Sequence, residues 1–326
     1  MSAMKLSFLA AGGYQGAAGG GPGVWPVAPQ NCDPEVAARS LSASLELARK
    51  ADELGFDWVS VSEHHYAPLM LTPNPLVWAG ALTQVVKRAK IALLGPVLPI
   101  NNPVRIAEET AMLDVISGGR VVALFLRGVP FEWKVYGPEP ADTKGATQEG
   151  IDLILKAWTC PETFAWAGDH HRFEVVSVWP RPLQRPHPPV YGSGNSEDSV
   201  VFAAQRRLGL AISFAPPAQV KKHVALYHAE AEKAGWSPGA DQVLYRAVAQ
   251  IAETDAEADA QAARTAQGRF TPYFLGGPKR VAGQIEALSE AGVGVIDLAF
   301  GAMGHERSLT ALEVLAKEVA PVVRDW

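Results

Sequence analysis

The sequence alternates short apolar runs with longer segments of helical periodicity. Each run is almost continuously hydrophobic, which is typical of strands covered on both faces in a parallel sheet. Strands that alternate with helices indicate repeated βα units. The apolar runs are Lys5–Ala10, Trp58–Ser62, Ile91–Leu98, Val121–Leu126, Val190–Gly192, Leu210–Ser213, Val243–Ile251 and Val295–Ala299.

The intervening segments carry the start and stop signals of helices. Asp33 and Pro34 supply an N-cap and a first-turn proline, and Gly55 ends the same segment. The predicted helices are Pro34–Leu54, Pro75–Arg88, Pro103–Ile116, Thr147–Trp158, Glu197–Leu208, Gln219–Ala234, Pro278–Ala291 and Ser308–Val319. Eight such units close naturally into a (β/α)8 TIM barrel that spans residues 1–326 as a single α/β domain. Because alternation alone does not prove closure, a doubly wound open sheet is the other possibility.

Two stretches interrupt the alternation. Residues Gly12–Asn31 are rich in glycine and proline and directly follow the first apolar run. Residues Phe164–Pro189 have the pattern of a short hairpin followed by a proline-rich connection. Neither stretch could bury a core of its own, so we predict insertions after strand 1 and before strand 5 of one domain. The first insertion is expected at the carboxyl end of the barrel, where barrel active sites are built.

Composition limits the classes of function. Apolar residues make up 48% of the chain and charged residues 19%, which fits a soluble enzyme with a substantial core. The net charge is −5, and the lysines and arginines are scattered rather than gathered into a nucleic-acid-binding stripe. The two cysteines make neither a disulfide framework nor a metal cluster. We therefore expect no metal site. No apolar stretch approaches the roughly 18 residues of a membrane helix, so we expect a cytoplasmic protein.

Polar side chains follow the second apolar run immediately. Glu63, His64 and His65 stand where a barrel strand would reach its carboxyl end, a position typical of catalytic residues. Histidine exchanges protons near neutral pH, and a neighbouring carboxylate can set its tautomer. Taken alone, the triplet is equally well explained as an ordinary polar strand end.

Two further places in the sequence could bind an anion. Arg127 ends the fourth apolar run, where a guanidinium can grip a phosphate or form a surface ion pair. The stretch Val190–Ser199 passes from a strand to glycines and small polar residues before a helix, and free N–H groups at a helix start can cradle phosphate. Plain N-capping of that helix explains the same residues. Glu197 and Asp198 must point away from the cradle if a phosphate is to bind there.

In combination, these motifs resemble the luciferase-like flavin-dependent monooxygenases, the family of bacterial luciferase. The matching phrases are GFDWVSVSEHHY, NPLVWAGAL, LPINNPVRIAEETAMLDVISGGR and PVYGSGNSEDSVVFAAQRRLGLAISF. They cover most of residues 1–215, and the last third fits more loosely through GGPKRVAGQIEALSEAGVGVIDLAF. Their combination in this order is far more specific than any single motif.

The resemblance implies a barrel that binds reduced FMN supplied by a separate NAD(P)H:flavin reductase. In the family, O2 adds to the flavin as a C4a-peroxide that oxidises an organic substrate, which is expected here to be small and hydrophobic. His64 matches the active-site histidine of the family, a candidate general acid or base beside the flavin ring, with Glu63 and His65 as its supports. The resemblance also implies a homodimer, because barrels of this kind commonly dimerise.

The resemblance further assigns contacts to the cofactor. The cofactor-binding residues that it predicts are Leu94, Gly95, Arg127, Gly194, Asn195, Ser196 and Ser199. Asn195 stands where luciferase has a glutamate. Leu94–Gly95 falls where the family has a non-prolyl cis peptide under the flavin ring, a bond that costs about 3–4 kcal/mol. Leu126 replaces a reactive cysteine of luciferase, which argues against light emission as the native role.

A lid is expected over the flavin, because the enzyme must keep water away from the reactive oxygen species. The first insertion, with Tyr14 and Trp25, and the segment Phe131–Tyr136 are the apolar candidates for it. Two other functions stay open. One is hydride transfer with a deazaflavin, which members of the same superfamily perform, and the other is non-catalytic flavin binding.

Overall fold

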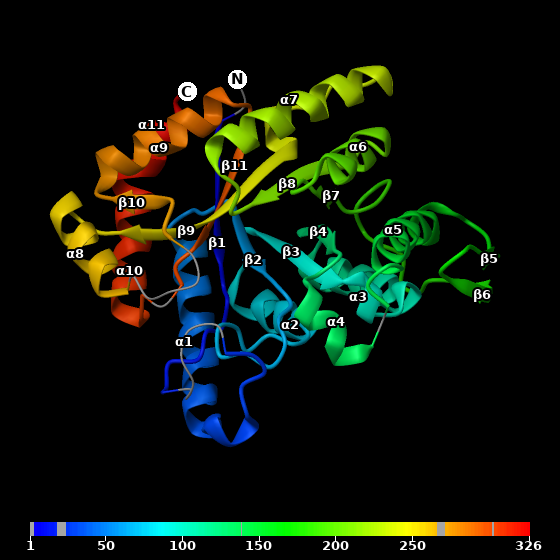
Figure 1. The fold of residues 1–326 in the computed structure, drawn as a ribbon, viewed down its shortest axis with the longest axis horizontal. Coiled ribbons are helices and arrows are strands. Elements are labelled where there is room, and N and C mark those ends of the chain that lie inside the picture. Colours follow the sequence, from blue (N-terminus) through cyan, green and yellow to red (C-terminus); the bar gives the residue numbers. More distant parts are fainter. Residues whose placement is uncertain (1–2, 18–23, 138, 266–270, 302) are drawn as a thin grey trace.

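Eight parallel strands form a closed barrel at the centre of the molecule (Figure 1). The computed structural model describes residues 3–17, 24–137, 139–265, 271–301 and 303–326. In barrel order the strands are β9 (Val243–Ile251), β11 (Val295–Ala299), β1 (Lys5–Leu9), β2 (Trp58–Val61), β3 (Lys90–Val97), β4 (Val121–Leu126), β7 (Val190–Ser193) and β8 (Gly209–Ser213). The pairing of β8 with β9, which sets Leu210 opposite Val243, closes the ring. The predicted barrel is therefore confirmed over the open sheet.

Helices alternate with the strands and surround the barrel (Figure 1). Asp33, Asn74 and Asn102 cap their helices, because each side chain accepts hydrogen bonds from two first-turn N–H groups and a proline follows it. The helices that follow the eight barrel strands are α1 (Pro34–Glu53), α2 (Pro75–Val85), α3 (Pro103–Ser117), α5 (Thr143–Thr159), α6 (Glu197–Gln205), α7 (Pro217–Lys233), α9 (Pro278–Glu290) and α10 (His305–Val314). Within the described ranges, no helix is both long and apolar enough to cross a membrane.

Several elements were not predicted. Helix α4 (Pro130–Tyr136), helix α8 (Asp255–Thr265), strand β10 (Phe274–Gly276) and helix α11 (Ala320–Arg324) are additional. The predicted helix Ser308–Val319 is α10 followed by a π-helical turn, Leu315–Val319. Helix α4 is only seven residues long, and the inner face of α8 consists mainly of alanine, so neither leaves a strong hydrophobic period. Helix α5 begins at Thr143, four residues before the predicted start at Thr147.

Both predicted insertions lie where we expected them. The antiparallel strands β5 (Phe164–Ala167) and β6 (Arg172–Val176) form a hairpin before β7, followed by the extended proline-rich connection. Residues 18–23 of the insertion after β1 lie outside the described residues. A short 3-10 turn, Pro29–Asn31, leads from it into α1.

The barrel interior is filled by every second residue of the strands, because successive side chains of a strand point to opposite faces. The apolar residues of this interior are Trp58, Ala92, Leu94, Val122, Leu124, Tyr191, Ala211, Leu244 and Val295. Among them lie buried polar residues, including Ser7, Ser60, Ser62, Arg246 and Asp297. A larger apolar layer packs between the outer face of the strands and the helices.

Strand β3 contains a bulge near its carboxyl end. Leu94 lies opposite Leu124, but the next paired residue, Val97, lies opposite Leu126, so β3 holds one extra residue. Gly95 takes a φ of 138° there, and a Cβ on it would lie 2.8 Å from a methyl carbon of Leu126. The expected cis peptide is corrected: among the described residues the cis bonds all precede proline, and Leu94–Gly95 is trans. The bulge and the glycine φ redirect the chain in its place.

Candidate active site

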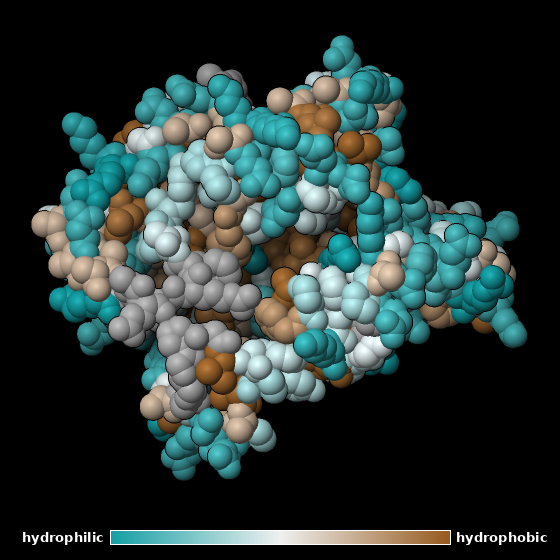
Figure 2. Space-filling view, viewed as in Figure 1, coloured by the Kyte–Doolittle hydropathy of each residue, from teal (hydrophilic) through white to brown (hydrophobic). Residues whose placement is uncertain are grey.

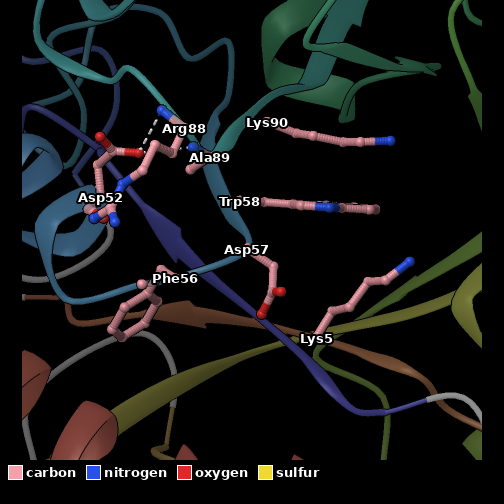
Figure 3. A pocket seen from close by; sticks show the side chains of 9 residues that line it. Lys5, Asp52, Phe56, Asp57, Trp58, Arg88, Ala89 and Lys90 are labelled. Atoms are coloured by element: carbon pink, nitrogen blue, oxygen red, sulfur yellow. Dashed lines mark hydrogen bonds between the residues drawn. The ribbon is translucent and has the colours of Figure 1, made fainter.

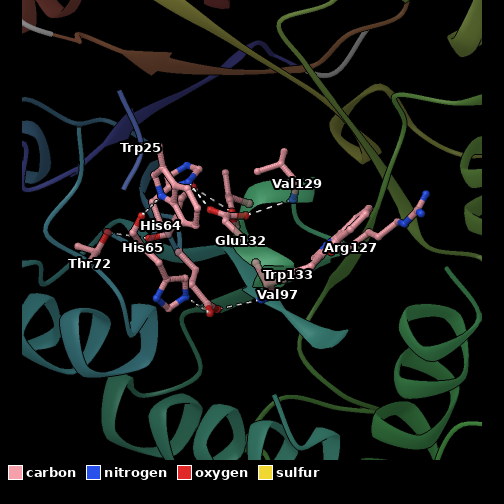
Figure 4. A network of polar contacts seen from close by, with 12 residues as sticks. Trp25, His64, His65, Thr72, Val97, Arg127, Val129, Glu132 and Trp133 are labelled. Carbon is pink, nitrogen blue, oxygen red and sulfur yellow. Dashed lines mark hydrogen bonds and ion pairs between the residues drawn. The ribbon is translucent and has the colours of Figure 1, made fainter. Parts of the chain in front are cut away.

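His64 faces a carboxylate that the sequence analysis did not assign to it. Its Nδ1 lies 2.6 Å from Oε1 of Glu132, and the other carboxylate oxygen accepts a hydrogen bond from the Val129 N–H (Figure 4). The side chain of Glu132 is 2% exposed and that of His64 is 30% exposed. A carboxylate accepts the proton on Nδ1, which leaves Nε2 of the imidazole as the proton acceptor. The pair can therefore exchange a proton at Nε2 of His64.

Glu63 and His65 do not support His64 as expected. His65 Nε2 lies 2.9 Å from Glu63 Oε1, and both residues are buried. The second oxygen of Glu63 accepts a hydrogen bond from the Val97 N–H, and the side-chain amide of Asn101 also approaches this carboxylate. Glu63 thus holds the end of the β3 bulge. The reason is geometric: the chain turns after β2, so neighbours in sequence point in different directions.

Trp25 joins the first insertion to the strand end and to α4. Its indole N–H donates to the carbonyl of His65 at 2.8 Å. Its ring lies 6.0 Å from the ring of Tyr66 in a stacked arrangement and 5.2 Å from that of Phe131. Aromatic pairs at these distances attract each other beyond the effect of area burial. The two segments expected to form a lid are therefore in contact through Trp25.

Arg127 projects from the end of β4 into solvent. Its Nε donates to Thr143 Oγ1 at 2.8 Å, and its guanidinium lies 4.8 Å from the ring centre of Trp133. The indole N–H of Trp133 donates to the Arg127 carbonyl at 2.7 Å, which fixes the stem of the arginine. Figure 4 shows the guanidinium pointing away from the pair of His64 and Glu132. Arg127 and His64 thus stand at two separate ends of one row of residues around α4.

The start of α6 carries hydroxyl groups and N–H groups at the surface. Ser196 and Ser199 cap the helix reciprocally, with their hydroxyl oxygens 2.8 Å apart. Among the described residues, no group accepts a hydrogen bond from the N–H of Glu197 or of Asp198. Such unpaired N–H groups at a helix start favour an anion, since they sit at the positive end of the helix dipole.

The two acids at the start of α6 are neutralised by lysines. Glu197 lies 2.6 Å from the Lys222 ammonium, and the hydrogen bond from that lysine lowers the pKa of Glu197. Asp198 lies 2.5 Å from the Lys144 ammonium, which lowers the pKa of Asp198 in the same way. The repulsion of a phosphate that these acids would exert is therefore offset by an adjacent positive charge.

The start of α5 brings Arg127 and α6 together. Thr143 accepts the hydrogen bond from Arg127, and the next residue, Lys144, pairs with Asp198. Sequence reasoning missed both α5 residues, because it started this helix at Thr147. Cationic and donor groups from the end of β4 and from the starts of α5 and α6 consequently lie at one stretch of surface.

Gly194 and Asn195 shape the turn before α6. The N–H of Gly194 donates to Ala211 at 2.7 Å and its carbonyl faces Nδ1 of His223 at 2.6 Å, so neither group is left for a ligand. The Asn195 side chain bonds both the N–H and the carbonyl of Ser213. Of the predicted phosphate contacts on this turn, the hydroxyls of Ser196 and Ser199 are the ones that stand at the surface of the helix start.

The opposite end of the barrel has a depression of about 350 Å³ (Figure 3). It is lined by Lys5, Trp58 and Lys90, which begin or adjoin the amino ends of their strands. Burial, together with the nearby charge of Lys5, lowers the pKa of Lys90. Active sites of TIM barrels lie at the carboxyl end, so this depression is not the candidate site. Figure 2 shows a hollow beside α4 with apolar surface in its floor. It lies on the same side of the molecule as the residues around α4.

A model of the luciferase-like monooxygenases matches residues 21–303 of the chain. The chain belongs to this family. It is 27% identical over 237 residues to the oxygenase component of a flavin-dependent trigonelline monooxygenase from Acinetobacter baylyi, a match covering 71% of this chain and 64% of that protein. It is 30% identical over 194 residues to the alkanal monooxygenase alpha chain of Photorhabdus luminescens, covering 59% and 53%. The matches thus span less than two thirds of these curated relatives.

Solved structures of this luciferase-like fold superpose over nearly the whole chain. The monooxygenase RslO1 from Streptomyces bottropensis has a TM-score of 0.83 at 26% identity and covers 98% of this chain and 99% of its own. The oxygenating constituent of 3,6-diketocamphane monooxygenase from Pseudomonas putida, in complex with FMN, has a TM-score of 0.79 at 21% identity, covering 98% of each chain. An F420-dependent secondary alcohol dehydrogenase has a TM-score of 0.76 at 17% identity, covering 99% and 100%. The last two likenesses establish the fold alone.

Proposed function

We propose that this chain is the oxygenase of an FMN-dependent monooxygenase that oxidises a small hydrophobic molecule. The observation that carries the proposal is the arrangement around α4: the pair of His64 and Glu132 at one end, and Arg127 with the start of α6 at the other. A flavin mononucleotide also has two different ends: a ring where protons are exchanged, and a phosphate that binds cations and hydrogen-bond donors. The named monooxygenases among the relatives support this reading over other uses of the barrel.

The residues at the proposed phosphate end fit a dianion. Arg127 offers a guanidinium whose Nη atoms face solvent or the Pro140 carbonyl. The start of α6 adds the N–H groups of Glu197 and Asp198, and Ser196 and Ser199 add hydroxyls. Lys144, whose ammonium pairs with Asp198 at the start of α6, adds a positive charge beside the proposed phosphate position. Charge-assisted contacts of this kind are worth roughly 1.5–3 kcal/mol each.

The residues at the ring end would handle protons and exclude water. When bound, reduced FMN supplies the electrons that activate O2, as cofactors rather than side chains carry such chemistry. His64 Nε2 would hold or accept a proton there, because Glu132 occupies Nδ1 and orients the ring. Trp25 and Phe131 would keep water from the hollow, and the floor of the β3 bulge at Leu94 and Gly95 would support the ring.

We also propose two protein partners. The trigonelline relative is named an oxygenase component, which supports a separate NAD(P)H:flavin reductase as the source of reduced flavin. A second copy of the chain is the other proposed partner, because α2 and α3 pack together and expose apolar side chains at Val77 (73% exposed), Met112 (50%) and Ile116 (55%). A cytoplasmic location, where NAD(P)H is available, completes the proposal.

Single-turnover oxidation with labelled oxygen tests the proposed function. The protein is loaded anaerobically with reduced FMN, mixed with ¹⁸O2 and a panel of small aldehydes, ketones and terpenes, and the products are analysed by mass spectrometry. A monooxygenase places one labelled atom in the product and the other in water. Reduction of a deazaflavin by a secondary alcohol without O2 would instead establish the hydride-transfer alternative. Flavin binding with no turnover of any panel member, and none with a deazaflavin, would count for a non-catalytic flavin-binding protein.

A further inference from the structure

A charged pair lies inside the barrel, beneath the candidate site. Arg246 on β9 is 7% exposed and Asp297 on β11 is fully buried, and Nε of the arginine lies 2.5 Å from Oδ2 of the aspartate. Ser7 and Ser60 donate to the other aspartate oxygen at 2.5 and 2.7 Å. These four residues lie on strands that adjoin in the barrel, β9, β11, β1 and β2, so the network is held rigidly.

Stability alone does not account for this pair. TIM-barrel interiors are dominated by bulky branched apolar side chains, and a buried ion pair is often no more stabilising than well-packed apolar residues of the same size. What the pair supplies is geometry, because a guanidinium presents its donors in a fixed planar fork. The two Nη atoms of the guanidinium bond serines at the end of β2: Nη2 donates to Ser60 Oγ at 3.4 Å, and Nη1 donates to Ser62.

Nη1 of Arg246 bonds Ser62, and Ser62 in turn bonds the β3 bulge. Nη1 of Arg246 donates to Ser62 Oγ at 2.5 Å, and Ser62 Oγ donates to the Leu94 carbonyl at 3.0 Å. A guanidinium has no acceptor, so the serine must accept from Arg246 and its single proton is directed at Leu94. The direction of the hydrogen bond to the Leu94 carbonyl is thereby set from inside the barrel.

The two ends of the bulge are held by consecutive residues. Ser62 holds the Leu94 carbonyl, and Glu63 accepts the N–H of Val97 at 2.9 Å. Gly95 lies between these points with its φ of 138°. Since neither end can rotate, the peptide between Leu94 and Gly95 has one orientation relative to His64, which follows Glu63 in the chain.

We propose that Arg246 and Ser62 are positioning residues for the flavin ring: they fix the Leu94–Gly95 peptide as the surface on which the ring rests. The proposal rests on the proposed function, because it takes FMN as the ligand and the β3 bulge as its ring support. It predicts that the interior network governs ring binding and leaves phosphate binding unchanged.

Flavin titration of two serine variants tests this role. Ser62→Ala removes the bond to Leu94, whereas Ser60→Ala removes a buried hydroxyl of the same network that contacts Asp297 and Arg246 Nη2 but not Leu94. FMN and riboflavin are titrated into each protein and followed by flavin fluorescence and the visible absorption spectrum. We expect Ser62→Ala to weaken both flavins by the same factor, roughly tenfold, as for one lost hydrogen bond, and to shift the bound spectrum. Ser60→Ala should change both affinities less than twofold. Wild-type affinity and spectrum in a folded Ser62→Ala protein would overturn the proposal.

Amide hydrogen exchange on the protein without flavin gives an independent readout. In Ser62→Ala, peptides covering residues 94–98 should exchange about tenfold faster than in wild type, while Ser60→Ala should leave them unchanged. If Ser62→Ala does not fold, Arg246→Lys serves in its place, since it keeps the charge opposite Asp297 but lacks the fork; equal exchange and affinity there reject the proposal. If the wild-type protein binds no flavin, the proposed function fails, and faster exchange at 94–98 still establishes that the network holds the bulge.

Discussion

Nδ1 of His64 lies 2.6 Å from Oε1 of Glu132, although His64 follows β2 and Glu132 lies in α4. Glu132 is buried and receives a further hydrogen bond from Val129, so it is held in place before any ligand binds. A buried carboxylate that orients an imidazole and leaves its second nitrogen as the proton acceptor is an arrangement suited to proton transfer. The pairing therefore makes Glu132 part of whatever chemistry His64 performs.

Glu132→Gln should lower turnover without weakening flavin binding. The amide keeps the shape of the side chain but replaces the carboxylate that contacts Nδ1 and orients the ring, so we expect kcat to fall roughly 10- to 100-fold. The FMN dissociation constant, measured by fluorescence titration, should stay within twofold. The double variant Glu132→Gln/His64→Ala should be no slower than His64→Ala, because residues that act as a unit are not additive. Additive losses would show that the two residues act separately.

Arg127→Ala should weaken FMN binding and leave riboflavin binding unchanged. Loss of one charge-assisted contact to a phosphate costs about 1.5–3 kcal/mol, which corresponds to a roughly 10- to 150-fold higher dissociation constant. Riboflavin lacks the phosphate and serves as the internal control. Lys134→Ala, which removes an exposed cation on α4, is the matched control protein and should bind both flavins like wild type. Equal losses for FMN and riboflavin would place Arg127 at the ring and not at the phosphate.

The strands and their ends could be predicted because they depend on local sequence. Each apolar run matched a strand to within one or two residues, and the polar residues after it therefore fell at the carboxyl end of the barrel. His64 and Arg127 were found in this way. The same reasoning placed the two insertions, since glycine, proline and turn residues act on the backbone at their own positions.

The partners of these residues could not be predicted, because they depend on how distant segments approach. Glu132 lies in the segment that we had assigned to an apolar lid, and a carboxylate in a seven-residue helix gives no periodic sign of its contact with His64. Arg246 and Asp297 each interrupt an apolar strand by one polar residue, and only the barrel register brings them together. The bulge at Gly95 likewise became visible only in the pairing of β3 with β4.

Asp52→Asn should destabilise the fold at neutral pH but not in acid. Asp52 accepts hydrogen bonds from the N–H groups of Lys87, Arg88 and Ala89 between α2 and β3. Figure 3 shows Asp52 beside Arg88 and Ala89. Burial raises its pKa, but these hydrogen bonds outweigh that effect and leave the pKa lowered. A lowered pKa in the folded state contributes stability above the unfolded value of about 3.9, and this stability is lost as the pH falls through the folded pKa.

Urea denaturation of Asp52→Asn at two pH values measures this contribution. We expect a loss of about 1–3 kcal/mol in the free energy of unfolding at pH 7, because the amide can accept fewer of the three bonds. The difference from wild type should shrink at pH 3. Glu53→Gln, at the neighbouring exposed position, is the control and should change stability by no more than about 0.5 kcal/mol. A loss in Asp52→Asn that is the same at both pH values would mean that the carboxylate charge does not contribute.

Trp25→Ala should uncouple flavin oxidation from substrate oxidation. Trp25 links the first insertion to the His65 carbonyl and to the rings of Tyr66 and Phe131, so its loss removes the contacts that join the two proposed lid segments. Water then reaches the reactive oxygen species more readily, and a larger share of the reducing equivalents should end as hydrogen peroxide. The ratio of peroxide to oxidised product, measured with a reductase and NADH, should rise several-fold, while FMN affinity stays within about twofold. Trp179→Ala, at a tryptophan that is 83% exposed in the connection after β6, is the matched control and should leave the ratio unchanged. A wild-type ratio in Trp25→Ala would show that these aromatic contacts do not exclude water from the site.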